Sequence, residues 1–316
     1  MQKLRIGKSD IETTAIGVGT MPWSNSSMWG YGSKLGLEEA GEAFKASLEA
    51  GIDFFDSAEI YGFGQSERVL GELVGGTDQK VYVASKYAPM PWRFTSGHVR
   101  RALEKSLDRL GLEHLDLYQV HFPGGWIGIE TLMEALADAV KAGLTRYIGV
   151  SNYNLEQMRR AHAALAKRGI PLVSNQVEYS LVQQSPRTNG LLQACQEMDI
   201  TLIAYSPLGR GALTGKYRPG KAPQDSRRFY GQFKQDKLEQ LAPLLDAMEE
   251  IGEAHGGAST AQVALNWLAR QPNVFPIPGA KNARQAQDNA AAIDWRMSNE
   301  EAGRVDDLST TFRGQD

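Results

Sequence analysis

The chain has 316 residues, of which 42% are hydrophobic, so it can bury a large core. Its formal net charge of −3 argues against a surface that binds nucleic acid or an anionic membrane. Cys195 is the single cysteine, which excludes an intrachain disulfide and favours a reducing compartment. The N-terminal sequence lacks the apolar region of a signal peptide, and no stretch approaches the roughly 18 apolar residues of a membrane span. We therefore expect a soluble, cytoplasmic protein.

The first predicted elements are two short strands around a turn. KLRIG (3–7) and DIETTAIG (10–17) flank the turn residues Lys8, Ser9 and Asp10. This arrangement is typical of a β-hairpin. We expect it to cover the bottom of a larger fold.

Eight further strand candidates follow along the chain. Most are almost continuously apolar, as expected of parallel strands that are covered on both faces. They comprise residues 14–19, 53–58, 81–87, 115–122, 147–152, 172–179, 201–207 and 274–279.

Helix-type segments with apolar residues at three- and four-residue spacing lie between the strands. Residues 37–51 begin with acids and end at a glycine, and residues 95–112 begin with a Thr-Ser pair that could cap a helix. Eight strands that are each followed by a helix predict a closed (β/α)₈ TIM barrel, an α/β fold. An open doubly wound sheet is the rival, but the first strand ends in GVGTMPWS, without a G-x-G-x-x-G fingerprint. We expect a single domain over residues 1–316.

Two of the predicted connections are unusually long. Met21–Gly36 follows the first barrel strand and is rich in Ser, Gly, Trp and Tyr. Leu208–Lys237 follows the seventh strand and contains Gly, Pro and basic residues. Loops of this length in a compact domain are commonly lids or binding loops.

Polar residues or glycines stand at the ends of seven successive strands. In a barrel of this type, the carboxyl ends of the strands form the active-site face. These residues are Asp56, Lys86, His121, Ser151 with Asn152, Gln176, Ser206 and Gly279. One such residue alone would be read as a satisfied turn residue. The series predicts a shared polar site at the mouth of the barrel.

Asp56, Tyr61, Lys86 and His121 form a set suited to proton transfer. A phenol has a pKa near 10, and a neighbouring lysine ammonium would stabilise the phenolate and lower that pKa. Asp56 would balance the buried charge of Lys86, and His121 could donate a hydrogen bond to a carbonyl oxygen. Such a site suits reversible carbonyl reduction with Tyr61 as the acid. Taken singly, Tyr61 could be a surface aromatic, Lys86 a structural ion pair and His121 a core histidine.

Several ordered motifs resemble the aldo-keto reductase family over nearly the whole chain. They are GIDFFDSAEIYG (51–62) with GQSERVLGE (64–72), RYIGVSN (146–152), NQVEYS (175–180), AYSPLGRGALTGKY (204–217) and IPGAKNARQAQDN (277–289). By this resemblance, Asp56, Tyr61, Lys86 and His121 fall on the four catalytic positions. The resemblance implies reduction of an aldehyde or ketone to the alcohol.

The same resemblance implies NADPH/NADP⁺ as the cofactor. Ser151, Asn152 and Gln176 would hold the carboxamide, Tyr205 would stack on the nicotinamide, and Lys281 would pair with the 2′-phosphate. The remaining cofactor-binding positions implied by the resemblance are Gly19, Thr20, Ser206, Leu208, Gly209, Arg210, Lys216, Arg227, Gly279, Gln285, Asp288 and Asn289. Each of the basic residues taken alone could equally be a solvated surface charge.

One departure from the family pattern affects the choice between NADPH and NADH. Many relatives have Arg at the position of Gln285, and a Lys-Ser pair in place of Gly279 and Ala280. The chain is more similar to the subgroup of the potassium-channel β subunits and their bacterial and plant relatives. The preference for NADPH therefore depends largely on Lys281.

Aromatic residues in the predicted loops suggest an apolar wall for a small carbonyl substrate. Trp23, Trp29, Trp92 and Trp126 are the substrate-binding candidates, with Tyr31 beside them. Ordinary loop packing explains any one of them equally well. Arg93 is the nearest basic residue that could recognise an anionic substrate.

Two other functions remain open at this point. A cofactor-sensing interaction protein, like the channel subunits, would bind NADP(H) with little turnover, but those subunits differ at the position of His121. A metal-dependent hydrolase would need clustered ligands, whereas the five histidines show no H-x-H or H-x-x-x-H spacing. The sequence therefore predicts no metal site. It indicates neither the physiological substrate nor the oligomeric state.

Overall fold

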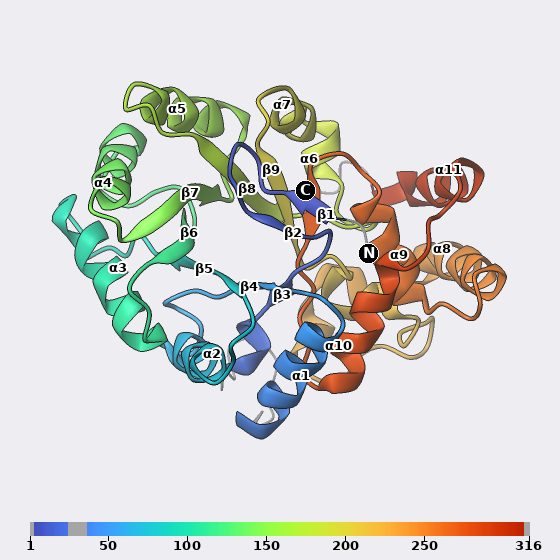
Figure 1. The fold of residues 1–316 in the computed structure, drawn as a ribbon. Coiled ribbons are helices and arrows are strands. Elements are labelled where there is room, and N and C mark those ends of the chain that lie inside the picture. Colours follow the sequence, from blue (N-terminus) through green and yellow to red (C-terminus); the bar gives the residue numbers. More distant parts are fainter. Residues whose placement is uncertain (1–2, 25–36, 313–316) are drawn as a thin grey trace.

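The computed structural model describes residues 3–24 and 37–312. Eight parallel strands pair in chain order from β3 to β10, and the helices form an outer layer around them (Figure 1). The ring is closed by a bridge between Gly19 and Gly279 and by a hydrogen bond of 3.0 Å from the Gly17 amide to the Pro276 carbonyl. The predicted closed (β/α)₈ barrel is confirmed.

The barrel strands are short and mostly buried, in agreement with their apolar sequences. The first of them begins later than the predicted residue 14, because Thr14 belongs to the hairpin. The eight are β3 (Val18–Gly19), β4 (Phe54–Asp56), β5 (Tyr82–Tyr87), β6 (Leu115–Val120), β7 (Thr145–Ser151), β8 (Leu172–Glu178), β9 (Thr201–Tyr205) and β10 (Val274–Pro276).

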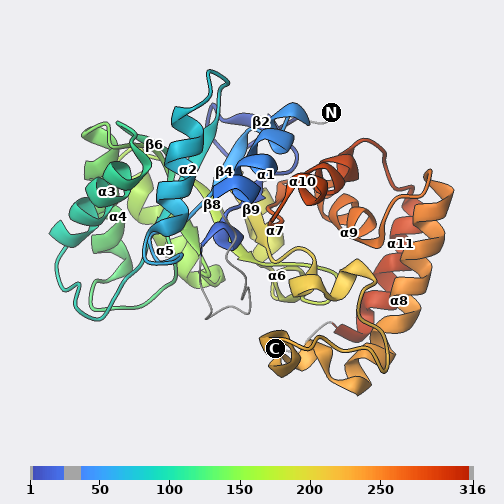
Figure 2. The same cartoon turned by 90° about the horizontal axis from the view of Figure 1, so that it is seen from below.

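The predicted N-terminal hairpin is formed by β1 (Lys3–Arg5) and β2 (Glu12–Thr14), which pair antiparallel. Ile6 and Ile11 lie between these strands and are fully buried against Phe54, Leu117 and other side chains that fill the barrel. Figure 2 shows the hairpin at one end of the barrel and the long segment after β9 at the other. The hairpin therefore closes the bottom of the barrel, as predicted.

The helices do not follow the simple rule of one after each strand. The single helices between strands are α1 (Leu37–Glu49), α2 (Gln65–Gly75), α3 (Gly97–Leu110), α4 (Ile129–Lys141) and α5 (Leu155–Ala166). Pairs of helices follow the last three strands: α6 (Ser185–Thr188) and α7 (Leu191–Glu197), α8 (Gln235–Ala254) and α9 (Thr260–Ala269), and α10 (Ala283–Ala290) and α11 (Asn299–Leu308). The expectation of eight strand–helix units is thus too simple for the C-terminal part.

The helix ends show which local signals in the sequence were informative. Asn154 and Gln157 form a capping box at the start of α5, which satisfies backbone N–H groups that have no partner in the helix. Gly111 ends α3 with a φ of 66°, in the left-handed region that glycine adopts readily. Ser96 precedes α3, but its side chain makes no capping hydrogen bond.

The long segment between β9 and α8 was predicted as a loop and contains three short 3₁₀ turns at Gly209–Thr214, Ser226–Phe229 and Gly231–Phe233. Only the start of the other long connection is described, as a 3₁₀ turn at Met21–Trp23. Among the described residues, no helix combines the length and apolarity needed to cross a membrane.

The carboxyl ends of the eight barrel strands face the same end of the barrel, because all of these strands are parallel. The segment after β9 lies at this end as well (Figure 2).

Candidate active site

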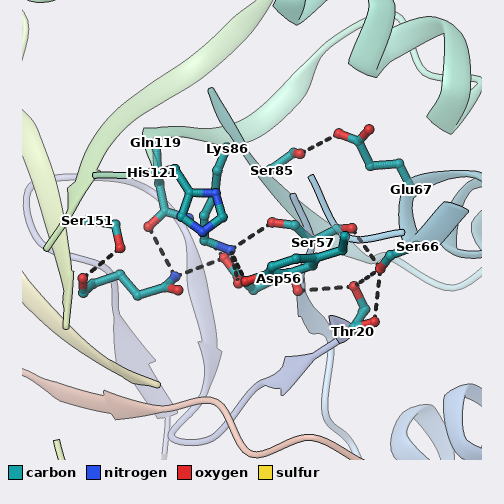
Figure 3. A network of polar contacts seen from close by, with 12 residues as sticks. Thr20, Asp56, Ser57, Ser66, Glu67, Ser85, Lys86, Gln119, His121 and Ser151 are labelled. Carbon is teal, nitrogen blue, oxygen red and sulfur yellow. Dashed lines mark hydrogen bonds and ion pairs between the residues drawn. The ribbon is translucent and has the colours of Figure 1, made fainter. Parts of the chain in front are cut away.

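The structure brings Asp56, Tyr61, Lys86 and His121 together at this end of the barrel. Asp56 is the last residue of β4, and Lys86 lies on the adjacent strand β5. The Lys86 Nζ atom donates to Asp56 Oδ2 and, at 2.8 Å, to the Ser57 carbonyl (Figure 3). It also lies 3.4 Å from Tyr61 Oη. The polar ends of neighbouring strands thus converge as predicted.

The turn after β4 places Tyr61 over the ion pair. The Tyr61 amide donates to the Ala58 carbonyl at 3.0 Å, and the lysine Nζ lies 5.0 Å from the centre of the phenol ring. Burial raises the pKa of Tyr61, the charge of Lys86 lowers it in part, and Asp56 raises it again. Lys86 thus lowers the pKa of Tyr61 as predicted, but burial outweighs this effect and the net shift is upward. Tyr61 is therefore protonated at neutral pH, in the form that can donate a proton.

Lys86 is fully buried and remains charged. Burial alone would lower the pKa of Lys86, but the charges and hydrogen bonds of Asp56 and Tyr61 outweigh that effect and raise the pKa. A buried ammonium without such partners would lose its proton. Lys86 therefore keeps its positive charge next to the phenol oxygen of Tyr61.

His121 follows β6 and faces Tyr61. The two rings are edge-to-face with their centroids 5.7 Å apart. Burial, followed by the charge of Lys86, lowers the pKa of His121 to about 3, so the imidazole is neutral at physiological pH. Its Nδ1 atom is buried without a hydrogen-bond partner in the described parts of the chain. A proton on Nε2 avoids a buried unpaired donor, and that nitrogen can then donate to a ligand.

Gln119 on β6 was missed by the sequence reasoning. Its Nε2 atom donates to Asp56 Oδ1 at 2.9 Å, and Gln176 on β8 donates to the same oxygen at 3.0 Å. The signal was an amide within the apolar run LDLYQVHFP, two residues before His121. In a strand covered on both faces, such a side chain needs a polar partner inside the barrel.

A second buried network extends from the other side of Asp56 (Figure 3). Thr20 Oγ1 donates to the Asp56 carbonyl at 3.1 Å and lies 2.7 Å from Ser66 Oγ, which in turn lies 3.0 Å from Ser57 Oγ. Glu67 on α2 accepts a hydrogen bond from Ser85. The structure thus places Thr20, predicted as a cofactor residue, inside this network, where it supports the end of β4.

The residues predicted to hold a nicotinamide carboxamide lie next to His121 and Asp56. Ser151 Oγ donates to the Gln176 carbonyl at 2.8 Å. Asn152 has a φ of 59°; its Nδ2 atom donates to the His121 carbonyl and its Oδ1 atom accepts from Tyr205 Oη at 3.0 Å. This chain of bonds joins β7, β8 and β9 around one side of the site.

Lys216, Arg227 and Lys281 form a cationic cluster. Burial lowers the pKa of Lys281, and Arg227 and then Lys216 lower it further, while Asp225 opposes them. Arg227 pairs with Asp225 and lies over the Tyr217 ring. Arg227 and Lys216 are therefore each close enough to repel Lys281.

Other predicted cofactor residues already have contacts within the protein. Ser206, Gly209 and Arg210 have positive φ values in the turn after β9, next to Leu208, and Arg210 pairs with Glu178 at 2.8 Å. Gln285 accepts from the Lys281 amide at 2.9 Å. Near these residues, Asn289 donates to the Gly279 carbonyl and Asp288 accepts from Gln262. Gly19 takes part in the closure of the barrel.

The predicted aromatic substrate wall needs a correction. Trp23 is buried in the core, where its Nε1 atom donates to the Ala280 carbonyl at 2.8 Å and its ring packs on Phe44 and Phe55. A tryptophan so enclosed cannot line an open pocket, so its assignment is wrong. Trp29 and Tyr31 lie outside the described residues.

The other two tryptophans that were predicted to bind substrate, Trp92 and Trp126, are exposed in the loops after β5 and β6. Trp92 and Trp126 are 60% and 71% exposed, and Trp126 donates to the Pro91 carbonyl at 2.7 Å. Arg93 makes a bidentate ion pair with Glu59, at 2.5 and 2.8 Å. Its charge is thereby balanced, which makes Arg93 a weaker candidate for recognising an anionic substrate.

The chain is similar to known proteins in both sequence and structure. The chain is 38% identical over 313 residues to a chloroplastic pyridoxal reductase of Arabidopsis thaliana, covering 95% of this chain and 84% of the relative. A solved glycerol dehydrogenase from Gluconobacter oxydans has a TM-score of 0.86 at 26% identity and covers 98% of this chain; 96% of that structure is covered in turn. An aldo-keto reductase from Klebsiella pneumoniae, solved with NADPH, has a TM-score of 0.77 at 29% identity, with coverage of 98% and 95%. The profile of the Aldo/keto reductase family matches residues 15–310. The chain therefore belongs to the aldo/keto reductase family.

Proposed function

We propose that this protein reduces an aldehyde or ketone to the alcohol with NADPH, and that Tyr61 supplies the proton. The observation that carries the proposal is the buried Lys86–Asp56 pair, whose ammonium lies 3.4 Å from the Tyr61 hydroxyl. A carbonyl oxygen that gains negative charge becomes far more basic than a phenolate, so proton transfer from Tyr61 is favourable at that moment. Lys86 then stabilises the phenolate that remains.

The neutral imidazole of His121 completes the proposed proton-donating site. It can donate one hydrogen bond to the carbonyl oxygen, and this bond strengthens as negative charge develops there. Because its pKa is about 3, His121 does not compete with Tyr61 as a proton donor at neutral pH. Asp56 fixes the position of Lys86 and balances its charge.

The residues present fit NADPH, whose bound nicotinamide would supply the hydride. In the cationic cluster of Lys216, Arg227 and Lys281, the charge of Lys281 is disfavoured by the other two cations, and a bound anion would offset that repulsion. Phosphate groups of the cofactor are suitable anions, and charge-assisted hydrogen bonds to them are strong. We assign Lys281 to the 2′-phosphate and Asn152 with Ser151 to the carboxamide. The complex of the Klebsiella relative with NADPH supports this choice of cofactor.

The proposed substrate is a small carbonyl compound. The exposed rings of Trp92 and Trp126 lie on the loops after β5 and β6, next to the catalytic strand ends. They offer apolar surface on which part of such a molecule could pack. The pyridoxal reductase relative supports an aromatic aldehyde as one candidate.

Replacement of Tyr61 with Phe tests the proton donor. The change removes only the hydroxyl, so we expect reduction of 4-nitrobenzaldehyde to fall by about two or more orders of magnitude, the size of a general-acid contribution. NADPH binding, followed by quenching of tryptophan fluorescence, should remain nearly unchanged. The rate is measured from NADPH absorbance. A Tyr61→Phe protein with the wild-type rate would remove Tyr61 from the mechanism.

The same assays separate the enzyme from a cofactor sensor. A sensor would bind NADPH but would oxidise it at a negligible rate with every carbonyl in a panel of aldehydes, ketones and quinones. His121 favours the enzyme, because its neutral imidazole faces Tyr61 and could donate a hydrogen bond to a carbonyl oxygen bound beside the Tyr61 hydroxyl.

A further inference from the structure

The hydrogen bonds around Asp56 reveal a side chain whose contribution goes beyond the four catalytic positions. Asp56 Oδ2 accepts from Lys86, and Asp56 Oδ1 accepts from both Gln119 and Gln176. Asp56 is 1% exposed, Gln119 0% and Gln176 2%, so water does not replace these bonds. In the described part of the chain, the side-chain donors to this carboxylate come from three strands of the barrel, β5, β6 and β8.

The carboxylate fixes which way both amides point. An ionised carboxylate only accepts hydrogen bonds, so each glutamine must turn its NH₂ group, and not its oxygen, toward Asp56. The Gln119 Oε1 atom then faces Gln176, whose Nε2 atom lies 3.3 Å away. The Gln176 NH₂ group donates one hydrogen bond to Asp56 Oδ1 and the other to Gln119 Oε1. Its own oxygen is consequently left as the acceptor that can face a ligand.

The register of the barrel explains how Gln119 reaches both partners. Gln119 pairs with Lys86 across β5 and β6, and with Gly149 across β6 and β7. A Cβ atom at Gly149 would lie 2.9 Å from the Gln119 Cγ atom and 2.3 Å from Ser174 Oγ. Only a glycine at this position leaves room for the glutamine to extend across the barrel between Asp56 and Gln176.

We propose that Gln119 is a positioning residue of the reductase. It holds Asp56 in the rotamer that binds Lys86, and it holds Gln176 in the orientation that leaves its oxygen free for the bound cofactor. Gln119 itself touches neither the substrate nor the reacting atoms. The catalytic part of this inference rests on the proposed function, whereas the orientation of the two amides does not.

The first test replaces Gln119 with Met, which has a similar shape but no hydrogen-bond donor. We expect kcat for 4-nitrobenzaldehyde to fall at least tenfold at an unchanged KM for the aldehyde. Gln184→Met is the matched control, because Gln184 is equally buried but donates to Ser309, the residue that follows α11. The control should keep kcat within twofold. A Gln119→Met protein with wild-type kcat would overturn the proposal.

The second test replaces Gln119 with Glu and uses pH as a switch. A protonated carboxyl can donate to Asp56 and accept from Gln176, as the amide does, whereas an ionised one repels Asp56. We expect kcat near that of the wild type at about pH 5 and a loss of tenfold or more at about pH 9. Asp56 faces the new carboxyl and shares its proton, whereas the other titratable groups nearby keep their protonation state in this range, because the pKa values of Lys86 and Tyr61 are raised and that of His121 is about 3.

Thermal unfolding without cofactor gives a readout that is independent of activity. In Gln119→Glu, the folded-state pKa of the carboxyl pair lies above its unfolded value, so the folded protein holds the extra proton more tightly. Stability relative to the wild type is therefore greatest at low pH and is lost as the pH rises toward that folded-state pKa. A Tm difference from the wild type that stays constant from about pH 5 to about pH 9 would overturn the assigned orientation.

The two readouts distinguish failure of this inference from failure of the proposed function. If the wild type reduces no carbonyl in the panel, the proposed function fails, and the melting series alone decides whether Gln119 donates to Asp56. If the wild type is active, and the ratio of the Gln119→Glu kcat to the wild-type kcat is the same at about pH 5 and about pH 9, the positioning role fails while the proposed reduction stands.

Discussion

At the scale of single residues, charge determines the properties of the site. Asp56 and Lys86 have been removed from water, and Lys86 keeps its proton because Asp56 and Tyr61 stabilise its charge. Breaking a buried pair by removing one partner leaves an uncompensated charge and is strongly destabilising. Conservative changes such as Tyr61→Phe are therefore more informative about the chemistry than truncations of Asp56 or Lys86.

Lys281 carries the prediction for cofactor preference at this scale. Lys281→Met keeps the length of the side chain but removes the charge assigned to the 2′-phosphate. We expect NADPH binding to weaken at least tenfold and NADH binding to change much less, since a charge-assisted contact contributes about 1.5–3 kcal/mol. Dissociation constants are measured by fluorescence quenching.

The control for Lys281 is Lys105→Met, an exposed position on the outer helix α3. It should leave both dissociation constants unchanged. Equal weakening of NADPH and NADH binding by Lys281→Met would contradict its assignment to the 2′-phosphate, because NADH lacks that group.

At the scale of elements, close contact between helices is set by the size of single side chains. Gly71 lies within α2 against the end of α3, and a Cβ atom there would stand 2.4 Å from the Leu110 carbonyl oxygen. A backbone atom of a packed helix cannot move aside cheaply. The packing of α2 on α3 therefore depends on this glycine. The same two elements carry Glu67 and Arg109, which form a largely buried ion pair at 2.6 Å.

Gly71→Ala tests this contact. Although alanine favours a helix by about 0.5–1 kcal/mol over glycine, we expect the overpacking to cost more and to lower the free energy of unfolding by about 1–3 kcal/mol. Gly303→Ala on α11 is the control, because nothing lies within 4 Å of a Cβ atom there. The control should gain about 0.5–1 kcal/mol. Urea denaturation measures both; a stabilised Gly71→Ala protein would show that α2 and α3 can separate without cost.

At the scale of the whole molecule, the barrel separates stability from chemistry. The hairpin fills one end with Ile6 and Ile11, while the polar strand ends and the segment after β9 occupy the other. In barrels of this type, the chemistry lies at the carboxyl ends of the strands and the opposite face contributes to stability. Changes at the two ends should therefore affect different measurements.

Ile6→Ala is the test of this separation. Ile6 is fully buried, so the truncation should lower the free energy of unfolding by about 2–5 kcal/mol. The turnover rate of the folded protein should stay within twofold of the wild type. Ile6→Val, which removes one methylene, should cost only about 0.5–1.5 kcal/mol. A large fall in kcat at a temperature where the protein is fully folded would show that the two ends of the barrel are coupled.

The sequence by itself determined the order of the strands, the hairpin and the residue types at the strand ends. Each of these features can be predicted from a short stretch of sequence. Apolar runs indicate covered parallel strands, and a polar residue at the end of such a run indicates a position at the mouth of the barrel. Asp56, Lys86 and His121 could be recognised for this reason, whereas Lys281 and the cations near it were indicated by the resemblance to the family.

Only the tertiary structure decided how those side chains act on one another. Trp23 looked like a loop aromatic, but its ring is enclosed by Phe44 and Phe55 from other elements. The pKa of Tyr61 rises because burial outweighs the charge of Lys86, a balance that depends on packing. Gln119 and Gln176 meet at Asp56 because β4, β6 and β8 point their side chains into one barrel. Burial and distance are properties of the closed ring, so no local pattern of residues could supply them.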